Sequence, residues 1–462
     1  MTHAIIVVDL GYGDAGKGTM TEFFAQQHSA HTVVRFNGGA QAGHNIIAPD
    51  GRHHTFSQFG SATLLPGVRT HLSRFMVLHP LAMISEAEHL ESLGVHDAFE
   101  RTTIDARAVV ITPFHQAANR LRELSRGNGR HGSCGVGVGE TMSDFVALGD
   151  QVPIAGDLAN PHLLRQKLHL IRQRKRQQLA PVLNLLKRNP LATNELAMLF
   201  DDDLIEACVD AFTAFAQRAR IVTPEHTHHL LNTDGTVVFE GAQGVLLDQW
   251  HGFHPYVTWS TTTFENALTL LSEGEHQGPV TRVGVVRAYG TRHGPGPFVT
   301  EDLALTHLIP DMHNAMHPWQ RGFRVGWFDA VATRYALEVC GGCDGLAVTC
   351  LDRLNAVTHW QNAASYDLDP SHSAAGLLAL GDDTPQRFER IVPDFGRQLD
   401  HQRALARVLE ACTPHYEGLE LGPASASPVQ RCAPVWEALG KTLNVPVRWT
   451  SSGPTLEEKQ AV

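Results

Sequence analysis

The chain has 462 residues, of which 43% are hydrophobic and 18% are charged. This balance excludes a disordered chain, and no run approaches the roughly 20 apolar residues of a membrane-spanning helix. The 37 basic residues against 48 acidic ones give a net charge of −11, which argues against a nucleic-acid partner. Seven scattered cysteines and an N-terminus without a basic segment predict a cytoplasmic protein with reduced thiols and no membrane partner.

The N-terminal segment predicts a parallel sheet. Residues 4–8 form a continuous apolar run, which is typical of a strand buried on both faces. A glycine-rich turn at 11–18, a helix at 19–27 and a strand at 32–36 follow in that order. Strand, glycine turn, helix and strand make up the βαβ unit of a parallel sheet.

The rest of the chain continues this alternation without an internal repeat or an obvious linker. Further strands are predicted at 108–111, 236–239, 282–286 and 345–349, and helices at 80–93, 161–187 and 330–339. The basic run at 172–176 is more typical of a solvated helix face than of a phosphate or partner site. We therefore predict an α/β fold, a large and mainly parallel central sheet flanked by helices with a P-loop-like nucleotide site, in which residues 1–462 form one elaborated domain.

The first glycine turn has the spacing of a phosphate-binding loop. Gly11 and Gly16, with four residues between them, are followed directly by Lys17 at the start of the helix. Glycines let backbone amides approach phosphate oxygens, and the lysine adds a positive charge. A tight turn without a ligand is the alternative, but the lysine favours phosphate. The Ser or Thr that ordinarily follows the lysine and holds Mg²⁺ is replaced by Gly18.

Two further residues indicate transfer chemistry at this loop. Asp14 lies within the loop, where a carboxylate repels phosphate unless it binds Mg²⁺ or takes a proton from a second substrate. His44 follows a second glycine-rich segment at 38–44, at the carboxyl end of the next parallel strand. A lone histidine is more often structural, but beside a phosphate site this one is a candidate general acid or electrostatic stabiliser.

Sequence blocks along nearly the whole chain resemble the adenylosuccinate synthetase family. Residues 13–18 resemble that family's GDEGKG loop, residues 34–44 resemble its VVRYxGG and AGH segments, and residues 239–244 match FEGAQG. Further blocks keep the family's order at 248–258, 288–298, 326–329, 351–352 and 452–454. The chain is identified on these blocks as a divergent member of the family.

The resemblance implies a GTP- and Mg²⁺-dependent ligase, acting as a homodimer on small molecules. It would join L-aspartate to the 6-position of IMP through a 6-phosphoryl intermediate, giving adenylosuccinate. Carried over to this chain, the catalytic residues would be Asp14 as the base, His44 as the acid, Lys17 and Gln243. Asp14 and the backbone of Gly43 would hold the metal.

The resemblance also implies the ligand contacts. The GTP-binding residues would be Gly13, Gly16, Lys17, Gly18, Asn45, Asp352, Ser452 and Gly453, with Asp352 reading the guanine donors. The nucleotide substrate would be bound by Gln41, Cys134, Gln243, Thr258 and Arg321, and the amino acid by Arg321 and Arg324.

Departures from the family pattern gather on substrate recognition. The family's TTGRGIGP stretch falls at 133–140, where Val136 replaces its arginine and Cys134 one threonine. The arginine that the family contributes across its dimer has no counterpart in 144–150, and the amino-acid loop carries Phe323 for its middle arginine. Loss of an arginine from a phosphate site removes a charged contact worth about 1.5–3 kcal/mol. Other cations, such as Arg292 or the run at 172–176, could restore it.

Three alternatives remain. The same phosphorylate-then-displace chemistry could act on a different nucleotide, for example a dGMP-type acceptor, or with a different amino donor. A GTP-binding protein without ligase activity is disfavoured, because nucleotide binding alone requires no Asp14 and His44. A zinc site is weak: Cys340 and Cys343 lack a second pair, and the histidines at 226–229 flank a turn.

Overall fold

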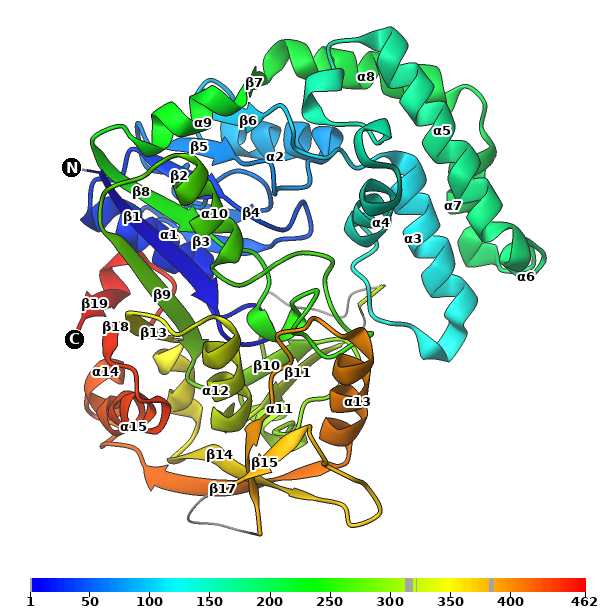
Figure 1. Ribbon diagram of the computed structural model, residues 1–462. Coiled ribbons are helices and arrows are strands. Elements are labelled where there is room, and N and C mark those ends of the chain that lie inside the picture. Colours follow the sequence, from blue (N-terminus) through cyan, green and yellow to red (C-terminus); the bar gives the residue numbers. More distant parts are fainter. Residues whose placement is uncertain (1, 312–318, 321, 382–385) are drawn as a thin grey trace.

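The computed structural model describes residues 2–311, 319–320, 322–381 and 386–462. Its centre is a ten-stranded sheet in the order β19-β18-β13-β9-β1-β8-β2-β5-β6-β7, which runs through the molecule in Figure 1. Neighbouring strands of this sheet are parallel, except that β19 runs antiparallel to β18. The predicted fold class is confirmed.

The strands of the large sheet are short. They are β1 (Thr2–Asp9), β2 (Thr32–Arg35), β5 (Arg69–Leu72), β6 (Thr102–Asp105), β7 (Arg220–Val222), β8 (Gly235–Glu240), β9 (Val280–Arg287), β13 (Gly345–Thr349), β18 (Val447–Ser451) and β19 (Lys459–Ala461). The smaller sheets contain β3 (His44–Ile47) and β4 (His53–Phe56), β10 (Gly290–His293) and β11 (Phe323–Gly326), and the group β12 (Phe328–Asp329), β14 (His359–Leu368), β15 (Leu378–Leu380), β16 (Phe388–Ile391) and β17 (Cys412–Glu420).

Helices cover the sheet and extend beyond it. They are α1 (Lys17–Gln27), α2 (Pro80–Ser92), α3 (Pro113–Arg126), α4 (Val138–Leu148), α5 (Pro161–Leu179), α6 (Leu183–Leu186), α7 (Thr193–Phe200), α8 (Leu204–Arg218), α9 (Pro224–Leu231), α10 (Glu265–Glu273), α11 (Leu303–Leu308), α12 (Ala330–Val339), α13 (Leu399–Glu410), α14 (Pro428–Arg431) and α15 (Ala433–Leu443). Helices α3 to α8 form an arm at the upper right of Figure 1, and their apolar side chains belong to one cluster with residues of α2 and of β3 to β6.

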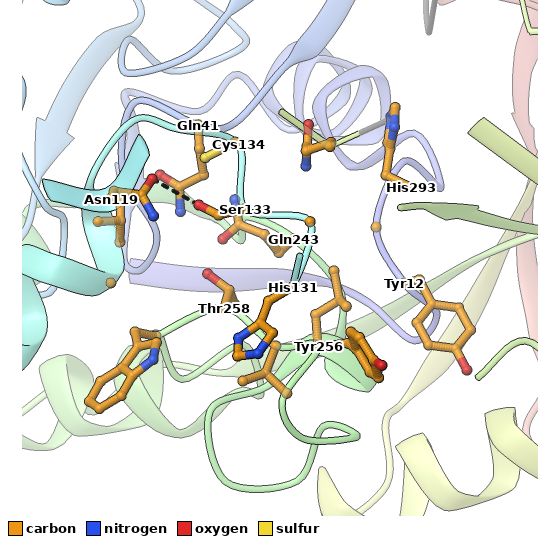
Figure 2. A pocket seen from close by; sticks show the side chains of 18 of the residues that line it. Tyr12, Gln41, Asn119, His131, Ser133, Cys134, Gln243, Tyr256, Thr258 and His293 are labelled. Atoms are coloured by element: carbon orange, nitrogen blue, oxygen red, sulfur yellow. Dashed lines mark hydrogen bonds between the residues drawn. The ribbon is translucent and has the colours of Figure 1, made fainter. Parts of the chain in front are cut away.

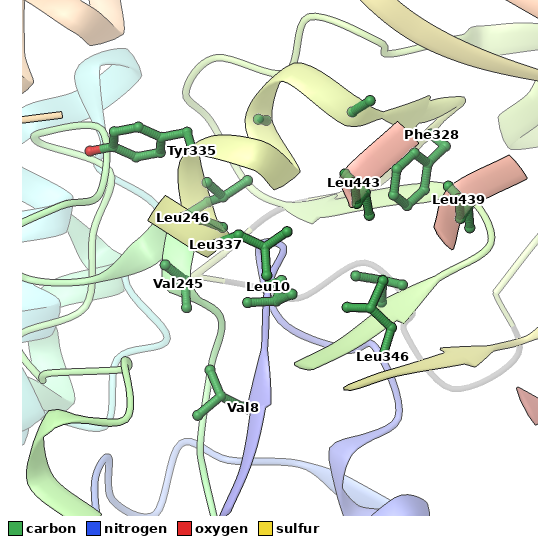
Figure 3. Packing of buried hydrophobic residues seen from close by; sticks show 14 of the residues in the cluster. Val8, Leu10, Val245, Leu246, Phe328, Tyr335, Leu337, Leu346, Leu439 and Leu443 are labelled. Atoms are coloured by element: carbon green, nitrogen blue, oxygen red, sulfur yellow. The ribbon is translucent and has the colours of Figure 1, made fainter. Parts of the chain in front are cut away.

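Strand β1 is buried on both faces, as its apolar run predicts. On one face Val8 and Leu10 pack with Leu246 and Leu346 beneath α12 and α15 (Figure 3). On the other face Ile5 and Val7 pack against Met20 and Phe24 of α1, and the side chains of residues 5–8 are at most 2% exposed. Burial of this kind contributes about 25 cal/mol per Å² of apolar surface, so the core fixes the strand whose end carries the glycine loop.

Two predicted elements differ from the structure. Residues 108–111 are buried but form no strand, because Val109 and Val110 make only isolated bridges to Ile154 and Leu78. The helix predicted over 161–187 ends at Leu179, where Pro181 interrupts it, since proline cannot donate the backbone hydrogen bond that would continue the helix. The basic run on α5 is not a solvated face either: Lys175 is fully buried and pairs with Glu140 and Asp144, at 2.7 and 3.0 Å.

The parallel topology brings the sequence blocks to one edge of the sheet. The loops after β1, β2, β8, β13 and β18 all leave the carboxyl edge, where open α/β sheets bind their ligands.

Candidate active site

A cavity of about 740 Å³ opens at the carboxyl edge of the sheet. It is bordered by the loops after β1 and β2, by the α3–α4 segment, and by residues 255–259. Figure 2 shows Gln41, Cys134 and Ser133 on one side of this cavity and Tyr12 and His293 on the other. The cavity unites Asp14, Lys17, Gln41, Gly43, His44, Cys134, Gln243 and Thr258, which the sequence places in the site.

The phosphate loop is built on left-handed backbone. Gly13 and Gly16 have φ values of 95° and 84°, and Asp14 has a φ of 59°. A residue with a Cβ rarely adopts this conformation, so its surroundings must hold it there. Asp14 presents its carboxylate to the cavity, one third exposed and 3.5 Å from the Nε2 atom of His293.

A carboxylate that the sequence analysis did not single out occupies the inside of this loop. Asp9 pairs with the ammonium of Lys17 at 3.0 Å, and both side chains are buried. Its oxygens also accept from the amides of Gly11, Gly13 and Ala15. The available signal was a charged residue that closes an otherwise apolar strand.

His44 is held by a second carboxylate, whose function the sequence did not indicate. Its Nδ1 atom lies 2.6 Å from an oxygen of Glu240, on β8, and Glu240 also accepts from the amide and the hydroxyl of Ser61. Burial alone would raise the pKa of Glu240, but Arg35, His44 and Ser61 lower it to about 2. Burial lowers the pKa of His44, against the opposing effect of Glu240. The ring is thereby oriented for proton transfer or charge stabilisation.

The missing hydroxyl at position 18 has a packing cause. A Cβ added to Gly18 would lie 2.6 Å from the Cβ of His44 and 2.8 Å from the Oγ of Ser61. The histidine therefore packs directly against the start of α1, where the backbone amides of the helix lack partners within it. This contact brings the loop and His44 to the same point of the cavity.

Two glutamine side chains that line the cavity have polar atoms without partners. Within the described chain, both polar atoms of the Gln41 side chain and the Oε1 atom of Gln243 are buried without a hydrogen bond. Buried polar groups ordinarily find partners, so both amides are available to a ligand. Beside them Ser133 donates to Asn119 at 2.9 Å (Figure 2), and burial raises the pKa of the Cys134 thiol.

The predicted GTP-binding residues Asp352, Ser452 and Gly453 follow strands β13 and β18 and do not line the 740 Å³ cavity. Asp352 lies just after β13, in a short 3-10 helix (Leu351–Ala356), and burial raises the pKa of its carboxyl. Ser452 and Gly453 follow β18, the neighbour of β13. The hydroxyl of Thr349 donates to the carbonyl of Ala15 at 2.7 Å, which ties the end of β13 to the phosphate loop.

Asn45 and Arg324 do not line the cavity, and Arg321 cannot be compared with it. Asn45 is on the β3–β4 hairpin, where its Oδ1 atom accepts from the Thr55 hydroxyl at 2.6 Å, and it does not line the cavity. Arg324 is on β11, paired with Glu301 and donating to the carbonyl of Gly296 at 2.9 Å. Arg321 lies outside the described residues, as does most of the loop that precedes it.

The arginines that line the cavity already have internal partners. Arg122 pairs with Glu140 at 2.5 Å and Arg126 pairs with Glu123. Arg292 is buried, lies over the ring of Tyr12 and donates to the carbonyl of Pro297 at 2.9 Å. Arg292, the candidate replacement for the missing phosphate-binding arginine, is therefore already bound to other groups of the protein.

Residues 2–311, 319–320, 322–381 and 386–462 contain neither a metal-binding side-chain cluster nor a membrane-spanning helix. No group of three or more His, Cys, Asp or Glu side chains is placed there to hold a metal ion, so neither Cys340 and Cys343 nor the histidines of α9 gather into a zinc site. No helix in those residues combines the length and apolarity needed to span a membrane.

Comparison with known proteins agrees with the sequence blocks. The family model described as adenylosuccinate synthetase matches residues 6–459. The adenylosuccinate synthetase of Clostridium beijerinckii is 34% identical over 363 residues, covering 76% of this chain and 78% of that protein. That of Desulfovibrio desulfuricans is 31% identical over 422 residues, covering 90% and 87%.

Two solved structures share the fold. The fully ligated adenylosuccinate synthetase of Plasmodium falciparum has a TM-score of 0.75 at 21% identity, covering 99% of both chains. The succinoaminodeoxyadenylate synthetase of cyanophage S-2L, bound to dGMP and to dATP as an energy donor, has a TM-score of 0.56 at 13% identity, covering 100% of this chain and 95% of that one. On the match across residues 6–459 and the relatives above 30% identity, the chain belongs to the adenylosuccinate synthetase family of GTP-dependent C–N ligases.

Proposed function

We propose that this chain joins L-aspartate to the 6-position of IMP with GTP as co-substrate, forming adenylosuccinate, GDP and phosphate. The observation that carries the proposal is that Asp14, within the Lys17 loop, and His44, packed against Gly18 of the same loop, line one cavity. A base and an imidazole beside a phosphate loop are what phosphorylation of a second substrate requires.

The residues divide the two steps between them. Asp14 takes the N1 proton of the 6-oxopurine, so that the 6-oxygen attacks the γ-phosphorus while the bond from that phosphorus to GDP breaks. His44, held by Glu240, stabilises the charge that develops on the departing GDP. The amino group of aspartate then attacks C6 and the phosphate leaves. Gln41 offers its unpartnered amide, and Gln243 its unpartnered Oε1 atom, to the nucleotide substrate, and Asp352 pairs with the guanine donors.

The donor set suits Mg²⁺. Asp14 offers a part-exposed carboxylate and Gly43 lines the same cavity, and proteins commonly hold Mg²⁺ with one or two such oxygens together with substrate phosphates and water. When bound there, the ion supplies charge neutralisation at the phosphate oxygens. Asp14 and the carbonyl of Gly43 are the residues that would hold it.

A homodimer and a cytoplasmic location complete the proposal. On α4, Val146 is 76% exposed and Phe145 37% exposed, in the region where the family's cross-dimer arginine is missing. Apolar side chains exposed in this way are typical of an interface. The seven cysteines are all unpaired, which suits a reducing compartment. Light scattering should give about twice the chain mass of 50.6 kDa.

A second candidate is the same chemistry on another acceptor or donor. The observation in its favour is that Arg122 and Arg126 are neutralised by Glu140 and Glu123, so the phosphate end of the site differs from the family's pattern.

A substrate panel separates the two candidates. Purified enzyme with GTP and Mg²⁺ is given IMP, dIMP, GMP or dGMP, each with aspartate and with other amino acids, and products are identified by mass. Adenylosuccinate from IMP and aspartate supports the first proposal, and a product from another pair supports the second. Phosphate release that needs neither acceptor nor amino acid would instead identify a GTPase.

A further inference from the structure

The carboxylate of Asp9 is bound by four donors of the phosphate loop. Its Oδ1 atom accepts from the amides of Gly11 at 2.8 Å and Gly13 at 3.3 Å. Its Oδ2 atom accepts from the amide of Ala15 at 2.9 Å and from the Lys17 ammonium at 3.0 Å. The residue is only 1% exposed, so these donors, and not water, satisfy the charge.

Asp9 holds the loop from behind. The amides that it binds come from alternate residues, which turn their N–H groups inward, while Asp14 and Lys17 line the 740 Å³ cavity in front. Asp9 does not border that cavity and instead borders a separate one of about 50 Å³ behind the loop. An amide nest of this kind ordinarily surrounds a bound anion, and here the anion belongs to the protein.

We propose that Asp9 is a positioning residue of the GTP site: its carboxylate fixes the phosphate loop in its binding conformation before nucleotide arrives and directs Lys17 to the cavity. The proposal rests on the proposed function in taking the nucleotide to be GTP. Such preorganisation lowers the cost of ordering the loop on binding. Because Asp9 binds the amides of Gly11, Gly13 and Ala15, the amides of Gly16 and Gly18 at the start of α1 remain able to donate to the phosphates.

An opposite role for Asp9 would have opposite consequences. If the carboxylate merely competed with the nucleotide for Lys17 and the amides, its removal would tighten GTP binding. If it served only the fold, its removal would lower the melting temperature without changing the kinetic constant for one substrate alone. The sign and the selectivity of the kinetic change therefore decide between these roles.

The variant to measure is Asp9→Asn, which keeps the shape of the side chain and removes its charge. We expect the KM for GTP to rise about tenfold or more, the scale of a lost charged hydrogen bond, while the KM values for acceptor and amino acid stay within about twofold. Glu86→Gln is the matched control, because Glu86 is also buried and accepts three backbone amides, those of residues 57–59, but lies away from the cavity. It should leave all KM values unchanged.

A double-mutant cycle tests whether Asp9 acts through Lys17. In a Lys17→Met background the further change Asp9→Asn should raise the KM for GTP by less than it does in the wild type, because the share that acts through Lys17 is already lost while the bonds to the loop amides remain. Fully additive effects, an unchanged KM for GTP in folded Asp9→Asn, or tighter GTP binding would each overturn the proposal.

A measurement on the unmodified enzyme keeps the proposal testable if the variants fail to fold. Amide hydrogen exchange is followed by NMR on [15N]glycine-labelled protein, with and without GTP. The amides of Gly11 and Gly13 should exchange slowly without nucleotide, and those of Gly16 and Gly18 should slow only when GTP binds. Protection of Gly11 and Gly13 that appears only with GTP would refute the role of Asp9. Failure of the wild-type enzyme to bind GTP would refute the proposed function instead, whatever Gly11 and Gly13 show.

Discussion

Gly18 shows how a single residue lets the phosphate loop and the facing histidine come together. The usual loop has a hydroxyl residue at this position, but a Cβ here would meet both His44 and Ser61 at less than 3.0 Å. The loop has therefore exchanged a metal-binding hydroxyl for contact with an imidazole. Asp14, four residues earlier, offers the oxygen that a metal needs.

Restoring the usual loop residue should therefore damage the enzyme. Gly18→Ser adds a side chain where His44 packs, and crowding of this kind typically costs about 1–3 kcal/mol. We expect a lower melting temperature and a lower kcat, because the imidazole must move. Both are measured by thermal unfolding and by steady-state assay. Thr19→Ser, one position along, is the control and should change neither, and higher activity in Gly18→Ser would contradict the packing account.

Asp14 carries the acid–base step in the proposed reaction. Asp14→Asn keeps the size of the side chain but cannot accept the proton, so ligation should fall about 10²–10⁴-fold, the usual contribution of general base catalysis. GTP binding should be largely kept, because Lys17 and the loop amides remain. Ligation is measured by product formation, and GTP binding by titration with a fluorescent GTP analogue. Undiminished turnover in Asp14→Asn would show that Asp14 is not the general base.

At the level of secondary structure, His71 joins three elements of the core. It lies on β5, where its Nδ1 atom meets the Thr103 hydroxyl of β6 at 2.9 Å and its Nε2 atom meets the Thr227 hydroxyl of α9 at 3.0 Å. The residue is fully buried, and burial lowers its pKa from 6.5 to about 4.

This histidine predicts a pH dependence of stability. Because the pKa of His71 is lower in the folded state, the unfolded chain binds the proton first, and stability is lost as pH falls from about 6.5 towards 4. The full shift corresponds to a change on the order of 3 kcal/mol in the free energy of unfolding. His71→Gln, which can still bond both hydroxyls, should lose less stability between pH 7 and pH 5 than the wild type. Equal losses in urea unfolding would contradict this.

Some strands could be located from the sequence pattern alone. Continuous apolar runs located β1, β8, β9 and β13, because strands buried on both faces need such runs. The same pattern failed at 108–111, since burial does not require a neighbouring strand along the whole segment.

At the scale of the whole molecule, the sequence order predicts that the loops that carry the sequence blocks meet at one edge of the sheet, because parallel strands share their carboxyl edge. The partners of the buried charged side chains could not be predicted from the sequence. Glu240 lies 196 residues from His44 in the sequence, and nothing local in either segment indicates the contact. The partners of Arg122 and Arg126 depend in the same way on how the helical arm packs.

The central claim is that the 6-oxygen of the purine receives the γ-phosphoryl group before aspartate displaces it. The direct measurement uses IMP labelled with 18O at the 6-oxygen, together with GTP and aspartate, and determines the mass of the inorganic phosphate formed. Phosphorylation of the 6-oxygen predicts one 18O atom in each phosphate released, because the labelled oxygen leaves C6 attached to phosphorus. Phosphate free of 18O, with adenylosuccinate still formed, would contradict it.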